Sequence, residues 1–395
     1  MNKRTTRLAI GGLVAMTLLA AACGSDDKAD STTAAPTTAA GAATTVAAAS
    51  TTAGGATTTK AGSASTAAPT TKGGSASSTP EKVSGTLQGS GSTFQLAYQQ
   101  EAIDAFQKAN SGTTITYGGG GSGKGRTDLA SKTVDFAGSD AAFADADKPA
   151  DPILYFPILM GPITVPYNLD GVDDLQLSAD TIAKIFQRQI TKWDDPAIVA
   201  DNPDAKLPST DIVVAHRSDG SGTTQNFTTW LSKAAPSTWT LAPGSTVEWP
   251  ADTQAGNGNA GVAQIVKDTK GAIGYVDLSD AKASGLKYAN VKNQAGKYIE
   301  PTAESASAAG DGIEVPDNLV FSALNSSAPE AYPITYQSWV IVYEKQPDAA
   351  KAALVKAYLS YLLQDGQDML GDLDYAPLPD SIQQKAVAQL DKITS

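Results

Sequence analysis

The junction between an apolar run and a helical pattern at residues 212–231 constrains the fold of this 395-residue chain more than any other segment. Residues 212–215 form an apolar run that predicts a buried strand, and Phe227, Trp230 and Leu231 then recur at helical spacing. A strand followed closely by a helix is the repeating unit of α/β folds. The same alternation recurs along the chain, with helices predicted at residues 94–109, 181–190, 261–266 and 349–363 and strands at 113–117, 134–138, 271–276 and 338–343. We therefore predict an α/β protein with a largely parallel sheet.

The turn of this junction has the groups that bind an anion. Arg217 stands at the end of the predicted strand, and Ser221, Gly222 and Thr223 open the helix. The first turn of a helix has N–H groups without partners and the positive end of the helix dipole, so it can receive an anion. The same residues also fit a capped helix after a tight turn, with Arg217 paired to Asp219. Taken alone, the segment leaves both interpretations open.

The first residues of the chain carry the pattern of an export signal. In residues 1–22, three cations precede an apolar run that is too short for a membrane span, which needs about 20 apolar residues. Cys23 is the only cysteine and follows this run directly, which resembles the cleavage box of bacterial lipoproteins. We expect a lipid on Cys23 to anchor the protein to the outer face of the cell membrane. Ordinary signal cleavage beside an incidental cysteine is the alternative.

Composition separates a tether from the globular part. Residues 23–82 are rich in Thr, Ala, Gly and Ser, and Val46 is their only large aliphatic residue. Such a segment cannot bury enough apolar surface to offset the entropy of ordering it, so it predicts a disordered tether. One cysteine and one histidine, His216, exclude an internal disulfide and the usual Cys/His metal sites. A formal charge of −12 disfavours nucleic acid as a partner.

Polar clusters fall where predicted strands end or helices begin. They occupy residues 92–94, 121–123, 139–140 and 217–223. In open α/β sheets, ligands bind outside the carboxyl ends of the strands. Converging hydroxyls, N–H groups and one arginine therefore predict a site for a small tetrahedral oxyanion.

Two enzyme interpretations of the same motifs fail. The segment 118–125 mimics a phosphate-binding P-loop, but Gly125 stands where that motif needs Ser or Thr. No Gly-x-Ser-x-Gly elbow is present for serine hydrolysis. His216 precedes Arg217 on a predicted strand, where successive side chains point to opposite faces, so it cannot serve as a base beside the arginine. We expect a protein that is not an enzyme and has no cofactor or metal.

Six motifs in order resemble one known family. They are residues 89–94, 117–123, 134–141, 185–195, 217–223 and 271–276. Together they resemble the phosphate-binding proteins of Pst-type phosphate ABC importers, over nearly all of residues 84–378. The resemblance implies the two-lobed periplasmic-binding-protein (Venus-flytrap) fold, with two crossings near residues 161–166 and 332–336. We expect residues 83–163 plus 335–395 to form one lobe and residues 164–334 the other.

The resemblance also implies the residues that contact phosphate, which are Thr93, Phe94, Ser122, Asp140, Arg217, Ser221, Gly222 and Thr223. Asp219 would orient Arg217. Asp140 decides specificity, because a carboxylate accepts a hydrogen bond from a protonated phosphate oxygen but repels sulfate, which has no proton to offer near neutral pH. The alternative for Asp140 is an aspartate that merely caps a helix.

The function implied is capture of inorganic phosphate in the cleft between the lobes and its delivery to the permease subunits of an ABC transporter. We expect a monomer that works outside the cytoplasm. A binding protein for another oxyanion such as sulfate, a secreted phosphatase on a related scaffold, and a surface protein that retains the fold without the ligand remain alternatives.

Overall fold

The structure, a computed structural model, describes residues 83–395. The predicted signal at 1–22, the lipidated Cys23 and the tether up to residue 82 lie outside the described residues. No helix within residues 83–395 has the length and apolar character needed to cross a membrane.

A six-stranded sheet forms what we call lobe 1. Its strand order is β10-β4-β14-β3-β1-β2. Their bounds are β1 (Gly85–Gly91), β2 (Thr113–Gly118), β3 (Phe136–Ser139), β4 (Ile153–Thr164), β10 (Val276–Asp277) and β14 (Thr335–Tyr343). Only the pairings β1–β2 and β1–β3 are parallel. The strand β14 brings the chain back between β3 and β4 and is antiparallel to both, and β10 is antiparallel to β4. The sheet is therefore mixed, and the prediction of a largely parallel sheet is wrong here.

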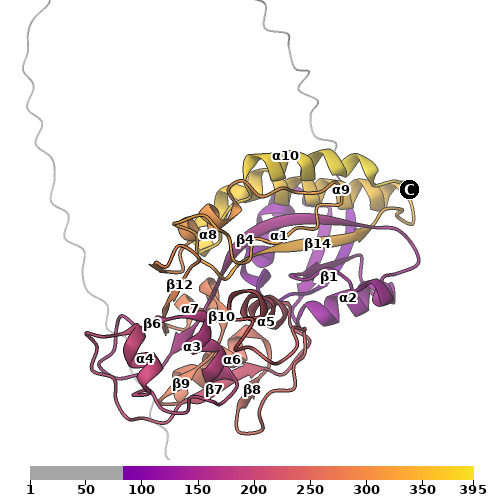
Figure 1. The fold of residues 1–395 in the computed structure, drawn as a ribbon. Helices are drawn as coiled ribbons and strands as arrows, with labels where there is room; N and C mark the ends of the chain where they lie inside the picture. The colour runs from indigo at the N-terminus through magenta and orange to yellow at the C-terminus, as the bar shows by residue number, and fades with distance from the viewer. Residues whose placement is uncertain (1–82) are drawn as a thin grey trace, which may run out of the picture. The chain divides into compact units, whose positions relative to one another are not determined.

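Helices cover both faces of this sheet, and Figure 1 shows α9 and α10 along one side of the strands and α2 along the other. Phe136 of β3 packs in one apolar cluster with Tyr358 of α9, whereas its neighbour Ala137 packs in another with Leu129 of α2. Successive residues of a strand point to opposite faces, so alternate residues of β3 pack against the helices on opposite sides of the sheet. The helices are α1 (Leu96–Ala109), α2 (Ser122–Ala130), α9 (Ala349–Leu363) and α10 (Asp380–Gln389).

A five-stranded sheet forms what we call lobe 2. Its order is β11-β5-β9-β7-β8, and β7 is parallel to both of its neighbours. The strands are β5 (Pro166–Tyr167), β7 (Val213–Arg217), β8 (Gln254–Gly256), β9 (Ala272–Ile273) and β11 (Lys287–Tyr288). The helices that carry its core are α3 (Ala179–Phe186), α5 (Gly222–Ala234) and α6 (Gly258–Asp268). The strand and helix predicted around Arg217 are thus confirmed.

Smaller elements complete the fold. A three-stranded sheet of order β13-β12-β6 is built from β6 (Gln176–Leu177), β12 (Asn290–Lys292) and β13 (Tyr298–Ile299). The remaining α-helices of the described chain are α4 (Pro196–Asp201), α7 (Leu278–Ala283) and α8 (Ala303–Gly310).

The two predicted crossings between the lobes lie side by side. Ile163 at the end of β4 accepts a hydrogen bond from Tyr332 Oη at 2.9 Å, and its N–H donates to the carbonyl of Ile334 at 2.9 Å. A third segment also connects the two lobes: β10, which follows β9 of lobe 2 in the chain, pairs with the end of β4 in lobe 1. The lobe boundaries expected from the sequence, by contrast, stay a prediction.

Candidate functional site

The turn between β7 and α5 presents a helix start and a buried cation together. Ser221 caps α5 by accepting a hydrogen bond from the N–H of Thr224 at 3.0 Å. Arg217 ends β7 and is only 4% exposed. Because Ser221 satisfies one donor of the first turn, the N–H groups of its neighbours Gly222 and Thr223 are the ones that can serve an anion.

Arg217 is held by two residues that accept three short hydrogen bonds from its guanidinium group. Its Nε and Nη2 donate to the two carboxylate oxygens of Asp219 at 2.7 and 2.5 Å, and its Nη1 donates to Asn259 Oδ1 at 2.6 Å. Burial raises the pKa of Asp219, but the hydrogen bonds and charge of Arg217 outweigh it and keep that pKa below its usual value. These bonds orient the guanidinium and use three of its five N–H groups, and a fourth donates to Thr223 Oγ1 at 3.5 Å. One N–H group on Nη2 is left for a ligand.

Asp140 lies in lobe 1 directly after β3 and is 2% exposed. Its Oδ2 accepts from Ser92 Oγ at 2.7 Å and from Ser122 Oγ at 3.0 Å, and its Oδ1 accepts from Ser338 Oγ at 2.5 Å. Burial raises the pKa of Asp140, while the three hydroxyls and the charge of Arg217 oppose that rise. A carboxylate with three hydroxyl donors has room for about one more donor.

The turn before α1 contacts lobe 2. Thr93 Oγ1 accepts a hydrogen bond from the N–H of Asn259 in α6 at 3.4 Å, and the N–H of Phe94 donates to Ser92 Oγ at 3.1 Å. Phe94 and Ser122, both predicted donors to an anion, thus have partners within the protein in this structure.

The two lobes contact each other directly at the predicted site residues. The N–H of Gly123 donates to the carbonyl of Gly220 at 2.8 Å, and Asn226 Nδ2 donates to the carbonyl of Asp140 at 2.7 Å. Gly222 lies directly against lobe 1, since a Cβ added there would be 2.3 Å from Ser122 Oγ and 2.6 Å from Asp140 Oδ2. The structure therefore brings Ser122 and Asp140 of lobe 1 against the first turn of α5, and Thr93 against α6.

Gly222→Ala is expected to weaken ligand binding by about 10- to 100-fold, because an added methyl group that overlaps neighbours costs roughly 1–3 kcal/mol. Alanine favours helix formation, so the loss of affinity would arise because the methyl group keeps the lobes apart and not because α5 is destabilised. Isothermal titration calorimetry measures the change. Gly371→Ala is the matched control, since a Cβ there meets no atom within 4 Å, and it should bind like the wild type. Unchanged affinity in Gly222→Ala would refute this role of the glycine.

Three residues that the sequence patterns did not single out, Asn259, Asp277 and Ser338, are hydrogen-bonded to the predicted site residues or to one another. Asn259 Nδ2 donates to Asp277 Oδ2, and Asp277 caps α7 by accepting from the N–H of Asp280 at 2.9 Å. Burial raises the pKa of both Asp277 and Asp280. Arg217 is thus linked through Asn259 to a second buried carboxyl group. Ser338, on β14, is 198 residues from Asp140, so nothing local in the sequence could have revealed that contact.

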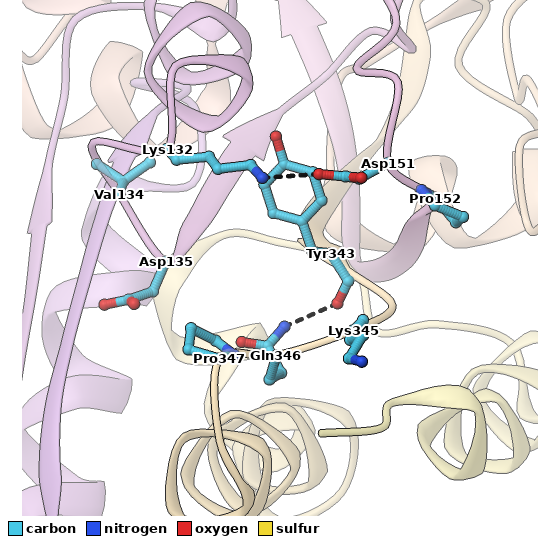
Figure 2. Close-up of a pocket in the computed structure, with 9 residues that line it drawn as sticks. All are labelled: Lys132, Val134, Asp135, Asp151, Pro152, Tyr343, Lys345, Gln346 and Pro347. Atoms are coloured by element: carbon cyan, nitrogen blue, oxygen red, sulfur yellow. Dashed lines mark hydrogen bonds and ion pairs between the residues drawn. The ribbon is translucent and has the colours of Figure 1, made fainter.

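A cavity of about 390 Å³ lies beside the site, between the starts of α1 and α6. Its lining includes Thr93, Asn257, Asn259, Asp280 and Tyr375. A different cavity of about 460 Å³ has none of the predicted site residues in its lining. Figure 2 shows the exposed ion pair of Lys132 and Asp151 at 2.7 Å in that second cavity. The first of these cavities is the one that adjoins the predicted anion site.

His216 takes no part in the anion site. Its ring stacks on Trp249 with centroids 5.2 Å apart, and its Nδ1 lies 3.0 Å from the carbonyl oxygen of Arg217. Burial lowers its pKa. Among residues 83–395, no group of three or more His, Cys, Asp or Glu side chains is arranged to hold a metal ion.

Comparison with known proteins decides the family. Residues 35–365 match the family model of a PBP superfamily domain. The Phosphate-binding protein PstS of Pasteurella multocida (strain Pm70) is 35% identical over 312 residues, which cover 77% of this chain and 89% of that protein. The chain belongs to the PstS family. Another PstS relative, the Phosphate-binding protein PstS 3 of Mycobacterium tuberculosis (strain ATCC 25618 / H37Rv), is 36% identical over 315 residues, covering 76% of this chain and 84% of that protein.

Solved structures agree with the PstS fold. A high-affinity periplasmic phosphate-binding protein, PfluDING, bound with phosphate, superposes with a TM-score of 0.64 at 22% identity, covering 77% of this chain and 93% of that one. A phosphate-binding protein from Stenotrophomonas maltophilia gives a TM-score of 0.63 at 19% identity, with 78% and 94% covered. The resemblance seen in the sequence and the two-lobed α/β fold are both confirmed. The names of these relatives, which are all binding proteins, also agree with the prediction that the chain is not an enzyme.

Proposed function

We propose that this PstS-family protein binds inorganic phosphate between its lobes and delivers it to the permease subunits of an ABC-type importer. The observation that carries the proposal is the approach of the two lobes, which brings the buried carboxylate of Asp140 against Gly222 at the start of α5, the helix that follows Arg217. A cation and a helix start attract an anion, and a buried carboxylate admits only an anion that carries a proton.

Each predicted residue has a role in this proposal. Arg217 supplies the charged donor, and Asp219 orients it. Ser221, Gly222 and Thr223 supply hydroxyls and N–H groups at the start of α5, and Thr93, Phe94 and Ser122 do the same in lobe 1. Asp140 accepts the proton of the phosphate. Ser122 would turn its hydroxyl from Asp140 to the ligand, because a hydroxyl rotates freely. The N–H of Phe94 would become available if the Ser92 side chain, its present acceptor, turned away.

Calorimetric titration of the purified chain with phosphate and with sulfate tests the proposal. We expect tight binding of phosphate and no measurable binding of sulfate. Equal binding of both would favour a general oxyanion receptor, and binding of neither would leave a surface protein that only shares the fold. Hydrolysis of a chromogenic phosphate ester would instead indicate a phosphatase.

We further propose that the protein works as a monomer whose lobes, residues 83–163 plus 335–395 and residues 164–334, close around the ion about the adjacent crossings. Two hydrogen bonds at Ile163 join these crossings, so the two segments can act together as one short hinge. Small-angle scattering should show compaction when phosphate is added to the phosphate-free protein. An unchanged radius of gyration would count against closure.

We also propose that the chain is exported and anchored to the outer face of the membrane by a lipid on Cys23. The sole cysteine, placed directly after the apolar run, supports this. The variant Cys23→Ser should be released into the medium, whereas the wild type stays with the membrane fraction. Mass spectrometry of an unmodified Cys23 in the mature protein would refute the anchor.

A further inference from the structure

The hydroxyl of Tyr336 is a buried hydrogen-bonding group without a partner. Within residues 83–395, three buried side-chain polar atoms lack one, and they are Trp230 Nε1, Trp239 Nε1 and Tyr336 Oη. All three rings pack in the same apolar core, but Tyr336 lies on β14, the strand that returns from the second crossing. Leaving such a group unsatisfied costs about 1–3 kcal/mol, so Tyr336 calls for an explanation.

The backbone of β14 aims Tyr336 at the anion site. Tyr336 and Ser338 are two residues apart on this strand, so their side chains leave the same face of the sheet. Ser338 Oγ donates to Asp140, which places that face toward the predicted ligand. The ring of Tyr336 also packs on the ring of Phe94, with centroids 4.2 Å apart, and this contact fixes its direction.

The surroundings of the hydroxyl are those of the site itself. Burial raises the pKa of Tyr336 well above its usual value, the negative charges of Asp140 and Asp277 raise it further, and the hydroxyl of Thr223 beside it opposes the rise. The phenol therefore stays protonated over the whole physiological range and acts as a hydrogen-bond donor. Since Thr223 belongs to lobe 2 and Asp140 to lobe 1, the hydroxyl lies where the two halves of the site meet.

We propose that Tyr336 Oη donates a hydrogen bond to an oxygen of the bound oxyanion, as a ligand that the second crossing contributes beside those of the two lobes. The inference rests on the proposed function, because it names a further contact of the same ligand. An anionic oxygen satisfies the buried hydroxyl better than a neutral acceptor does, since hydrogen bonds to charged groups are about twice as strong. The bond would also tie the ligand to the strand about which the lobes close.

The variant Tyr336→Phe tests this, because it removes the hydroxyl and keeps the ring on Phe94. Hydrogen bonds to a charged group contribute about 1.5–3 kcal/mol, so we expect phosphate affinity to fall roughly 10-fold or more. Without phosphate, the melting temperature should stay equal or rise, because an unsatisfied hydroxyl has been removed. Calorimetry gives the affinity, and thermal unfolding of phosphate-stripped protein gives the stability.

Tyr98→Phe is the matched control. Tyr98 is equally buried but lies within α1, and its hydroxyl donates to the carbonyl of Leu362 in α9 at 2.8 Å. This variant should lower the melting temperature and leave phosphate affinity within about twofold of wild type. Phosphate affinity within twofold of wild type in Tyr336→Phe would overturn the inference while leaving the proposed function intact. So would a lowered melting temperature with no selective loss of binding. A wild-type protein that does not bind phosphate would overturn both.

Discussion

Arg217→Met is expected to lower phosphate affinity about 100- to 1,000-fold, since charge-assisted hydrogen bonds from a buried guanidinium and the loss of its charge together amount to roughly 3–4 kcal/mol. Methionine keeps much of the volume of the side chain, so the packing beneath β7 should survive. The loss would come from two sources, the missing N–H donors and the exposure of the ligand to the negative charge of Asp219. Titration calorimetry with phosphate measures it.

The same substitution should also destabilise the phosphate-free protein by about 3 kcal/mol, because it leaves Asp219, whose side chain is 10% exposed, without its buried partner. The double variant Arg217→Met/Asp219→Asn removes the orphaned charge and should recover most of that stability. It should not recover affinity, because the donors to phosphate are still missing. If the double variant bound phosphate as tightly as the wild type, Arg217 would be a structural residue held by Asp219 and nothing more.

Local patterns were enough to predict the parts of the site that neighbouring residues build. The strand β7, its turn and the start of α5 lie within one short segment, so the apolar run and the capping serine specify them together. The capped-helix interpretation of this segment is confirmed, because Ser221 caps α5 and Arg217 pairs with Asp219. The anion-binding interpretation stays a prediction. The sequence also shows the polar cluster at residues 92–94, of which Thr93 and Phe94 are predicted to contact phosphate and Ser92 is not.

Long-range contacts could not be predicted from one sequence. Ser338, Asn259 and Asp277 reach the site from three different elements, and their residue types are common in ordinary loops and strands. Tyr336 falls within the crossing predicted near residues 332–336, and no pattern in the sequence marks its hydroxyl as a donor. The antiparallel pairing of β4 and β14 could not be predicted either, because a buried strand has a continuous apolar run whichever direction it takes in the sheet.

Asp140→Asn is expected to reduce the preference for phosphate over sulfate by roughly 10⁴-fold, the discrimination available to a site that pairs with one proton of its ligand. The amide is neutral, so it no longer repels a fully ionised oxygen, and its NH₂ group can donate to sulfate. The hydroxyls of Ser92, Ser122 and Ser338 can rotate to suit the amide, so the fold should be preserved. Competitive titration of phosphate against sulfate measures the ratio. Asp151→Asn, which changes an exposed carboxylate paired with Lys132, is the control and should leave the ratio unchanged.

The same reasoning gives a pH dependence with a definite sign. Burial raises the pKa of Asp140 above the ordinary value of 3.8, so on acidification Asp140 takes up a proton earlier than an exposed aspartate would. Once protonated it is neutral and can donate a hydrogen bond, as the asparagine does. Discrimination against sulfate should therefore weaken in the wild type as the pH falls through the raised pKa of Asp140, and it should stay low and nearly constant in Asp140→Asn. A preference for phosphate that survives the substitution, or that falls equally with pH in both proteins, would mean that selectivity arises from the donors at the start of α5 and not from Asp140.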